Sequence, residues 1–208
     1  MILTADALAF DMDGTLVDSR DLILEVWSGW AARRDLDAAQ VHAFCHGRPL
    51  HRIIAHFAPD ADLPAEAEWV LGQMRPRESL LRPVAGAADL LASLDPVEWA
   101  LVTSAPAELA RRWMAICGLP LPPVVVTADD VAHPKPDPEP FALAARGLGH
   151  APARIIAFED AAAGLASAKA AGMETVGLSG ATGSLASIPD YRRLSRDDGH
   201  PIRLSLVD

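Results

Sequence analysis

The chain has 208 residues, of which 50% are hydrophobic and 22% charged, and its formal net charge is −10. A chain of this length can form one large core and a small second domain. The acidic balance argues against a nucleic-acid partner, which needs a basic stripe, and no run approaches the ~18 apolar residues of a membrane span.

The first predicted element is a strand over 7–10, and a pair of carboxylates follows it directly. Asp11 and Asp13 are two residues apart, and side chains at i and i+2 of a strand point to the same side. Their repulsion is relieved by a shared cation or proton, and Gly14 allows a sharp turn. A divalent ion held by few carboxylates, with one carboxylate free to attack, suits phosphate esters. The plain alternative is a solvated acidic turn.

Residues 18–82 show helical spacing of apolar side chains and no strand pattern. Three faces with this spacing are Ile23, Val26, Trp27 and Trp30; Leu50, Ile53, Ile54 and Phe57; and Trp69, Val70, Gln73 and Met74. We expect a helical cap over 18–82, inserted into a domain made of 1–17 and 83–208. Tryptophans at helical spacing are expected to pack in the cap core rather than on a ligand.

From residue 84 onward, short apolar runs alternate with helical patterns. Strands are predicted at 98–102, 124–126, 154–158 and, as the last one, 174–178; helices are predicted at 86–94, 106–118, 138–146 and 161–171. This alternation indicates an α/β fold with a doubly wound parallel sheet covered on both faces. The site of such a sheet lies beyond the carboxyl ends of its strands, which selects Asp11, Thr103, Asp129 and the pair Glu159-Asp160.

Thr103 and Ser104 come between a predicted strand and a predicted helix. A hydroxyl and free helix N–H groups can bind a phosphoryl oxygen, so both are candidate phosphate-binding residues. The alternative is an ordinary helix N-cap.

Lys135 stands in the sequence His-Pro-Lys-Pro-Asp-Pro over 133–138. The flanking prolines keep it out of a helical conformation, and Asp137 can cap the helix that follows. The chain has 16 arginines and only two lysines, Lys135 and Lys169. A lysine at this position therefore suggests the need for a compact point charge on a phosphate. A solvated loop lysine is the alternative.

Glu159 and Asp160 follow another strand. Mg²⁺ needs only one or two carboxylates when water and phosphate fill its other positions, so Asp11 and Asp160 would suffice. The alternative role for Asp160 is an N-cap.

The cap contains four histidines: His42, His46, His51 and His56. A zinc site is one interpretation, but Gly47 and Pro49 interrupt any single helix between them, and surface or substrate contact is favoured. Arg48 and His46 are the cap residues that we expect to reach a substrate; the alternative for Arg48 is a solvated loop arginine.

Taken together, Asp11-x-Asp13-Gly14-Thr15, Thr103, Lys135 and Glu159-Asp160 resemble the four motifs of the haloacid-dehalogenase-like hydrolase superfamily, in order along the whole chain. The resemblance implies a Rossmann-like core with a C1-type helical cap. Within the superfamily the chain resembles sugar phosphatases and the glycerol-3-phosphate and 2-deoxyglucose-6-phosphate phosphatases. This narrower likeness is carried by residues 46–48, 101–104, 116–120 and 126–131.

The resemblance implies a magnesium-dependent phosphatase that acts on small sugar or polyol phosphates. Asp11 would form an aspartyl-phosphate, and Asp13 would act as general acid and then as general base. Mg²⁺ would be held by the Asp11 carboxylate, the Asp13 backbone carbonyl and the Asp160 carboxylate, with Glu159 in support. Thr103, Ser104 and Lys135 would bind the phosphoryl oxygens.

Two departures from the family pattern are Ala161-Ala162-Ala163 after the fourth motif and His133-Pro134 before Lys135. Neither removes a catalytic group.

Other activities predict other residues. A dehalogenase would not need Asp13 or the metal ligands, and a phosphonatase would need a cap lysine, which 18–82 lacks. A sugar phosphomutase of the β-phosphoglucomutase type shares the same core set and remains the enzymatic alternative. A phosphate-binding regulatory domain would be expected to have lost a motif.

The two cysteines, Cys45 and Cys117, form no CxxC pattern, and no charged leader is visible, so we expect a cytoplasmic protein, by default a monomer.

Overall fold

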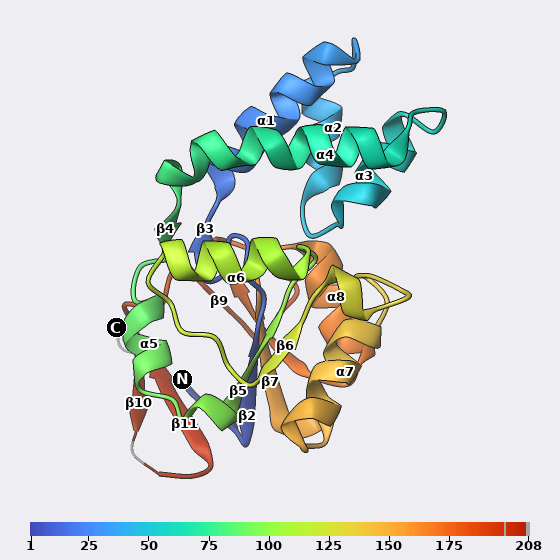
Figure 1. Cartoon of the computed structure of the whole chain (residues 1–208). Coiled ribbons are helices and arrows are strands. Elements are labelled where there is room, and N and C mark those ends of the chain that lie inside the picture. Colours follow the sequence, from blue (N-terminus) through green and yellow to red (C-terminus); the bar gives the residue numbers. More distant parts are fainter. Residues whose placement is uncertain (198, 207–208) are drawn as a thin grey trace.

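A six-stranded parallel sheet forms the centre of the molecule in the computed structural model, which describes residues 1–197 and 199–206 (Figure 1). Its strands in spatial order are β6 (Val124–Val126), β5 (Trp99–Val102), β2 (Ala7–Phe10), β7 (Ile155–Glu159), β8 (Glu174–Leu178) and β9 (Ala186–Ile188). Phe10 lies opposite Leu101 on one side and Phe158 on the other. The residues that follow these three strands therefore meet at one edge of the sheet.

The two faces of the sheet carry side chains of different size. Leu8 and Phe10 of β2 point into the larger core, whereas Ala7 and Ala9 point into a smaller core. All residues of β2, β5 and β7 are buried, which explains their continuous apolar sequences.

Helices cover both faces of this sheet. The smaller core includes side chains of α7 (Glu139–Leu148) and α8 (Ala162–Ala170), and the larger core includes those of α5 (Ala87–Ala92) and α6 (Ala107–Ile116). The predicted fold class, a doubly wound α/β sheet with an added helical part, is confirmed.

The prediction that 174–178 is the last strand is wrong. The parallel sheet continues with β9, and a separate antiparallel sheet joins β1 (Ile2–Ala5), β11 (Ile202–Leu206) and β10 (Leu194–Asp197). In β1 and β11 only alternate residues are buried, such as Leu3 and Leu204, and in β10 none is. A short strand in which apolar and polar residues alternate gives a weaker sequence signal than a continuous apolar run.

Four helices lie together beyond the carboxyl ends of the parallel strands (Figure 1). They are α1 (Arg20–Arg33), α2 (Ala38–Cys45), α3 (Leu50–Phe57) and α4 (Leu63–Met74), followed by a 3₁₀ turn at Arg75–Leu80. The antiparallel pair β3 (Val17–Asp18) and β4 (Arg82–Pro83) connects them to the sheet. We propose that these helices are the cap, with 18–82 as its bounds.

The sequence reading did not predict α2. Its apolar pattern is short, but Asp37 supplies a start signal, because its carboxylate accepts the backbone N–H of Ala39. The expectation that the cap tryptophans pack internally holds for Trp30, which is fully buried. Trp27 is also buried, but it borders the cavity described below.

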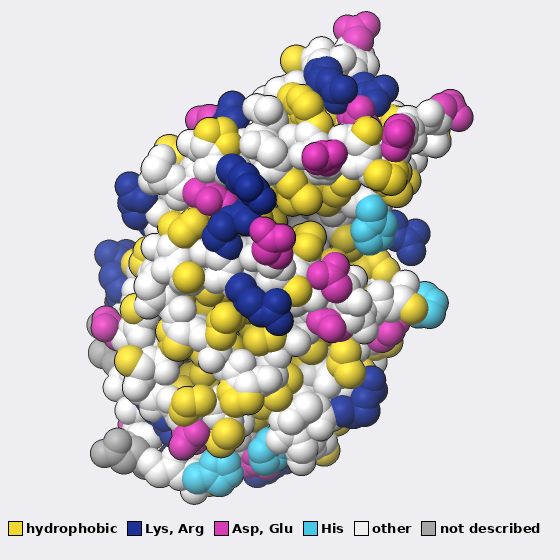
Figure 2. Space-filling view, viewed as in Figure 1, with side chains coloured by type: hydrophobic (Ala, Val, Ile, Leu, Met, Phe, Trp, Pro, Cys, Tyr) yellow, Lys and Arg dark blue, Asp and Glu magenta, His cyan; other side chains and the backbone are white. Residues whose placement is uncertain are grey.

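Charged side chains of both signs are interspersed over the cap and α6 on the face shown in Figure 2. Among the described residues, no helix has the length and apolar character that crossing a membrane requires.

A buried glutamate ties two cap helices together. Glu66 of α4 accepts hydrogen bonds from Trp30 Nε1 at 2.6 Å and Arg33 Nη1 at 2.9 Å, and it also pairs with Arg34. These bonds, above all the one from Arg34, lower the pKa of Glu66 to about 2. The ionised carboxylate therefore stabilises the packing of α1 against α4.

Replacing Glu66 by Gln is expected to lower the free energy of unfolding by about 2 kcal/mol at pH 7, because the amide keeps the Trp30 bond but loses the charge. A carboxyl whose folded pKa is depressed contributes its stability above its unfolded pKa and loses it as the pH falls through the folded value. The difference in the free energy of unfolding between Glu66→Gln and the wild type should thus have its full size at pH 6 and shrink steadily below about pH 4.5. Urea unfolding at pH 7, 5 and 3.5 measures it; a difference that does not change with pH would contradict this role.

Candidate active site

Four carboxylates and one ammonium group meet at the carboxyl edge of the parallel sheet. Asp11 follows β2, Glu159 ends β7 and Asp160 comes next. The Lys135 Nζ lies 2.7 Å from Asp11 Oδ1, 2.7 Å from Glu159 Oε1 and 2.9 Å from the backbone oxygen of Val102. All three N–H bonds of the ammonium group are therefore used.

Lys135 is 3% exposed, an unusual degree of burial for lysine. Burial alone would lower its pKa, but the charges of Asp11 and Glu159 more than compensate and raise it. The side chain is a permanent cation beneath the Asp11 carboxylate.

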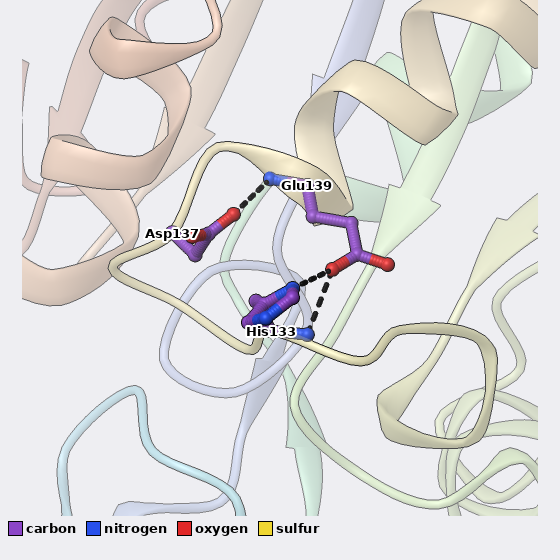
Figure 3. Close-up of side chains that lie close together, drawn as sticks. All are labelled: His133, Asp137 and Glu139. Atoms are coloured by element: carbon purple, nitrogen blue, oxygen red, sulfur yellow. Dashed lines mark hydrogen bonds and ion pairs between the residues drawn. The ribbon is translucent and has the colours of Figure 1, made fainter.

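The loop that carries Lys135 is fastened to the start of α7 (Figure 3). Glu139 accepts the backbone N–H groups of Ala132 at 3.0 Å and His133 at 2.7 Å, and Asp137 accepts the N–H of Glu139 at 2.9 Å. Asp137 thus accepts the first N–H group of α7, as predicted for a capping side chain, although the N-cap position itself is Pro138. His133, Asp137 and Glu139 lie close enough to bind an ion, but their hydrogen bonds already account for the cluster as a brace for this loop.

Asp13 is held by a residue that the sequence interpretation did not single out. Ser19 donates its hydroxyl to Asp13 Oδ1 at 2.6 Å, and Ser19 is itself buried. Loss of solvent and the charge of Asp11 raise the pKa of Asp13 to about 7. A carboxyl with this pKa can give or take a proton near neutral pH. The one sequence signal for Ser19 is its position four residues after the first motif, which ends at Thr15.

Asp160 packs directly against Gly14. A Cβ atom at Gly14, whose φ is +74°, would overlap Asp160 Oδ2, so both the turn and the close approach require glycine. Burial and the charge of Asp11 raise the pKa of Asp160 to about 9. The N-cap alternative is wrong for Asp160, because α8 has Ala161 at this position with no side-chain cap.

The site has the charge and the ligand atoms that a divalent cation requires. Asp11, Glu159 and Asp160 offer oxygen atoms that all lie within 4.8 Å of one another. Burial and Asp11 also raise the pKa of Glu159 to about 7, although Lys135 pairs with it. The single ammonium group therefore does not balance the charge of four carboxylates. A second cation would do so, and a set of donors made only of oxygen atoms suits Mg²⁺.

Glu159 is placed by α8 as well as by Lys135. Its second oxygen accepts the Ala161 N–H at 2.9 Å, and Gly164 of α8 leaves room for the carboxylate, since a Cβ there would overlap Glu159 Oε1. Glu159 is 0% exposed, so it has no other space to occupy.

Replacing Gly164 by Ala is expected to lower stability by about 2 kcal/mol through overpacking and to reduce activity through displacement of Glu159 and Lys135. Gly72 of α4 provides the matched control, because nothing lies within 4 Å of a Cβ at that position. Gly72→Ala should gain about 0.5–1 kcal/mol, the usual benefit of alanine in a helix. Thermal melts and phosphatase assays of both variants test this; equal stability of the two would contradict it.

Thr103 and Ser104 follow β5, and both hydroxyls have partners. The Thr103 hydroxyl accepts the Ala105 N–H at 3.0 Å, and Ser104 donates to the backbone oxygen of Gly47 at 3.0 Å. Ser104 therefore links the core to the cap. Neither residue caps α6, because its N-cap residue is Pro106, which makes no side-chain hydrogen bond to the helix.

Asp129 does not join the site. Its carboxylate accepts the Ala107 N–H at 2.8 Å and lies exposed at the start of α6. The expectation that it faces the other carboxylates is wrong, because a 3₁₀ turn at Ala128–Asp130 carries it past the strand end.

A cavity of about 110 Å³ opens between the cap and the carboxylates. Asp11, Asp13, Ser104 and Asp160 border it from the core, and Arg48 and His46 border it from the cap, as expected for substrate-contacting residues. Thr103 and Lys135 lie buried behind this wall. The apolar residues that line the remainder were not predicted, because no motif marks them.

The cap histidines have separate surroundings. His42 Nε2 lies 3.1 Å from Ser28 Oγ, His46 Nδ1 lies 3.1 Å from the His42 backbone oxygen, and His56 stacks on Phe44 at 4.0 Å. Burial lowers the pKa of His51. Among the described residues, the metal-ligand groupings include none of these histidines.

Known proteins were compared with this chain. A family model described as haloacid dehalogenase-like hydrolase matches residues 5–172. Hexitol phosphatase A of Escherichia coli is 38% identical over 172 residues, which cover 80% of each protein. Glycerol-1-phosphate phosphohydrolase 1 of Saccharomyces cerevisiae is 33% identical over 193 residues, covering 85% of this chain and 75% of the relative.

Among solved structures, a hydrolase from Pseudomonas syringae shares the fold with a TM-score of 0.79 at 23% identity, covering 89% of this chain and 94% of that one. The family resemblance predicted from the four motifs is confirmed. The chain belongs to the haloacid dehalogenase-like hydrolases.

Proposed function

We propose that this protein is a magnesium-dependent phosphatase that hydrolyses small sugar or polyol phosphate monoesters through an aspartyl-phosphate on Asp11. The observation that carries the proposal is the Asp11 carboxylate, held at 2.7 Å by Lys135 and bordering the cavity under the cap. The chain is a phosphoric monoester hydrolase, and relatives named as phosphatases of hexitol phosphate, glycerol 1-phosphate and 2-deoxyglucose 6-phosphate support the substrate class.

Asp11 acts as the nucleophile in this proposal. One Oδ atom is held by Lys135, and a carboxylate oxygen attacks phosphorus while the ester P–O bond breaks. Lys135 also places its positive charge beside the phosphoryl oxygens, where negative charge is carried during transfer.

Asp13 transfers the protons. With a pKa raised to about 7, a protonated fraction is available at neutral pH to protonate the leaving alcohol. The carboxylate that remains then takes a proton from the water that attacks phosphorus in the second step. Ser19 holds Asp13 in one orientation for both steps.

The Asp11 and Asp160 carboxylates and the Asp13 backbone carbonyl would hold Mg²⁺, and Glu159 supports them by fixing Lys135 and the turn at Ala161. The bound cation would neutralise charge on the transferring phosphoryl group. Thr103 and Ser104 are proposed to bind its oxygens once the substrate competes for their present hydrogen bonds.

The first test is release of inorganic phosphate from p-nitrophenyl phosphate, with Mg²⁺ and after treatment with EDTA. We expect phosphate release that depends on Mg²⁺ and is lost on chelation. A folded protein with no phosphatase activity on this ester or on a panel of sugar and polyol phosphates would contradict the proposal.

A second assay separates hydrolysis from phosphomutase activity. A mutase must hold a bisphosphate, which requires a cationic cluster on the cap. Arg48 instead donates to the Phe44 backbone oxygen at 2.8 Å and stacks on that ring. In phosphorus NMR with a hexose 1-phosphate and a trace of its 1,6-bisphosphate, we expect free phosphate; conversion to the 6-phosphate would favour the mutase.

A further inference from the structure

The cavity next to the catalytic aspartates has a polar floor and apolar walls. Asp11, Asp13 and Asp160 form the floor on the core side. The walls are built from three cap helices and α6, and the residues that define them are Trp27, Ile53, Leu71, Met74, Leu109 and Trp113. Figure 2 shows hydrophobic side chains along this seam beneath α4.

The polar atoms of Trp113 and Cys45 within these walls have protein partners, and Arg48 uses one of its N–H groups within the cap. Trp113 donates its Nε1–H to Glu78 at 3.2 Å, and the Cys45 thiol donates to the His42 backbone oxygen at 3.4 Å. Arg48 donates to the Phe44 backbone oxygen and lies over the Phe44 ring at 4.3 Å. Of these three side chains, Arg48 therefore keeps N–H groups that these bonds do not use.

A hydroxyl group that enters such a wall loses its hydrogen bonds to water and gains none in return. The loss of a polar group's partners on burial is expensive, whereas a methylene gains free energy at the same place. The polar groups that stay available in the cavity are those at the floor, where the phosphoryl group must bind, and the side chains of Arg20, His46 and Arg48 on the cap.

We propose that, among small sugar and polyol phosphates, the enzyme favours those whose alcohol part turns an apolar, deoxygenated face to the cap, such as deoxy-sugar phosphates, over fully hydroxylated ones. This inference rests on the proposed function, because it assigns the cavity to the leaving alcohol. Trp27, Met74 and Trp113 are then specificity-determining residues that contact the alcohol rather than the reacting atoms.

The test compares two four-carbon esters, butyl phosphate and erythritol 4-phosphate, by their kcat/KM values. The hydroxyl next to the ester makes erythritol the better leaving group, so intrinsic reactivity works against the expected result. We expect kcat/KM to be at least about tenfold higher for butyl phosphate, the size of effect that one unpaired polar group produces. Equal values, or a preference for the erythritol ester, would overturn the inference and leave the phosphatase proposal intact.

Calorimetric binding of the two corresponding phosphonates provides a ranking that needs no turnover. If no ester is hydrolysed, the proposed function fails, and this ranking alone decides the inference: tighter binding of the butyl compound supports it, and equal or weaker binding contradicts it.

Substitutions of cavity-wall residues test whether the wall causes the preference for the apolar ester. Met74→Gln changes a buried wall residue to an amide of similar size and should reduce the butyl-to-erythritol ratio at least about fivefold, because the amide can pair with a hydroxyl. Leu80→Gln makes a comparable change at an exposed position outside the cavity and should leave the ratio unchanged. If Met74→Gln does not fold, Leu71→Gln, at a part-exposed wall position, replaces it. An unchanged ratio in a folded wall variant would contradict the assignment.

Discussion

Replacing Asp11 by Asn is expected to reduce phosphate release by about 10³-fold or more, because an amide is a poor nucleophile and a poor cation ligand. The fold should persist. The Asn oxygen can still accept from Lys135, and loss of one charge relieves repulsion with Asp13 and Asp160. We expect an unfolding temperature within about 4 °C of the wild type.

The control for this variant is Asp129→Asn, which changes an exposed aspartate at a neighbouring strand end. Asn can replace Asp129 as a cap for α6, so both activity and stability should stay close to the wild type. Activity of Asp11→Asn within tenfold of the wild type would exclude the covalent mechanism.

Replacing Lys135 by Arg is expected to reduce activity by about 10²-fold or more, although the charge is kept. The Nζ group of Lys135 places its three donors on Asp11, Glu159 and the Val102 oxygen, an arrangement that suits a tetrahedral ammonium group. A planar guanidinium is larger and cannot reproduce these directions in a side-chain space that is 1% exposed.

Lys169→Arg is the matched control, since it makes the same change in the only other lysine of the sequence. Lys169 is exposed and contacts the backbone oxygen of Gly183, so its replacement should not affect kinetics. Circular dichroism would confirm that both variants fold. Near-normal kcat/KM in folded Lys135→Arg would show that the point charge is not required.

The parallel sheet could be predicted because its strands are buried on both faces. The strands predicted at 124–126 and 174–178 match the observed strands residue for residue. The antiparallel sheet of β1, β10 and β11 was missed because β1 and β11 bury only two alternate side chains each and β10 buries none. Such strands are defined by their partners, which lie far apart in the sequence.

The site could be predicted as far as its groups follow strand ends. Asp11, Glu159 and Asp160 come together in this way, because parallel strands bring their carboxyl ends to one edge. Lys135 reaches them from the loop before α7, where its unusual sequence rather than a strand end marked it. Asp129 also follows a strand closely in the sequence, but its carboxylate accepts an N–H group at the start of α6 instead of joining the site. The local turn after a strand decides where such a side chain points.

The contacts between cap and core could not be predicted. Ser104 bonds to Gly47 across 57 positions of sequence, and a Cβ at Gly47 would lie 2.8 Å from the Cβ of Ala161. These contacts depend on how the cap helices meet the sheet and its helices, which no local pattern encodes. The apolar cavity wall has the same origin, because α1, α3, α4 and α6 each contribute part of it.

The central claim is that the phosphoryl group passes through Asp11, and chemical trapping of that intermediate tests it most directly. Enzyme mixed with a turned-over ester and Mg²⁺ is quenched in acid within milliseconds and treated with borohydride, which reduces an acyl phosphate to an alcohol. Peptide mass spectrometry then identifies the residue that carried it. We expect homoserine at position 11 and unmodified Asp13, with no product when the ester is omitted. Modification at another carboxylate, or none under conditions of turnover, would contradict it.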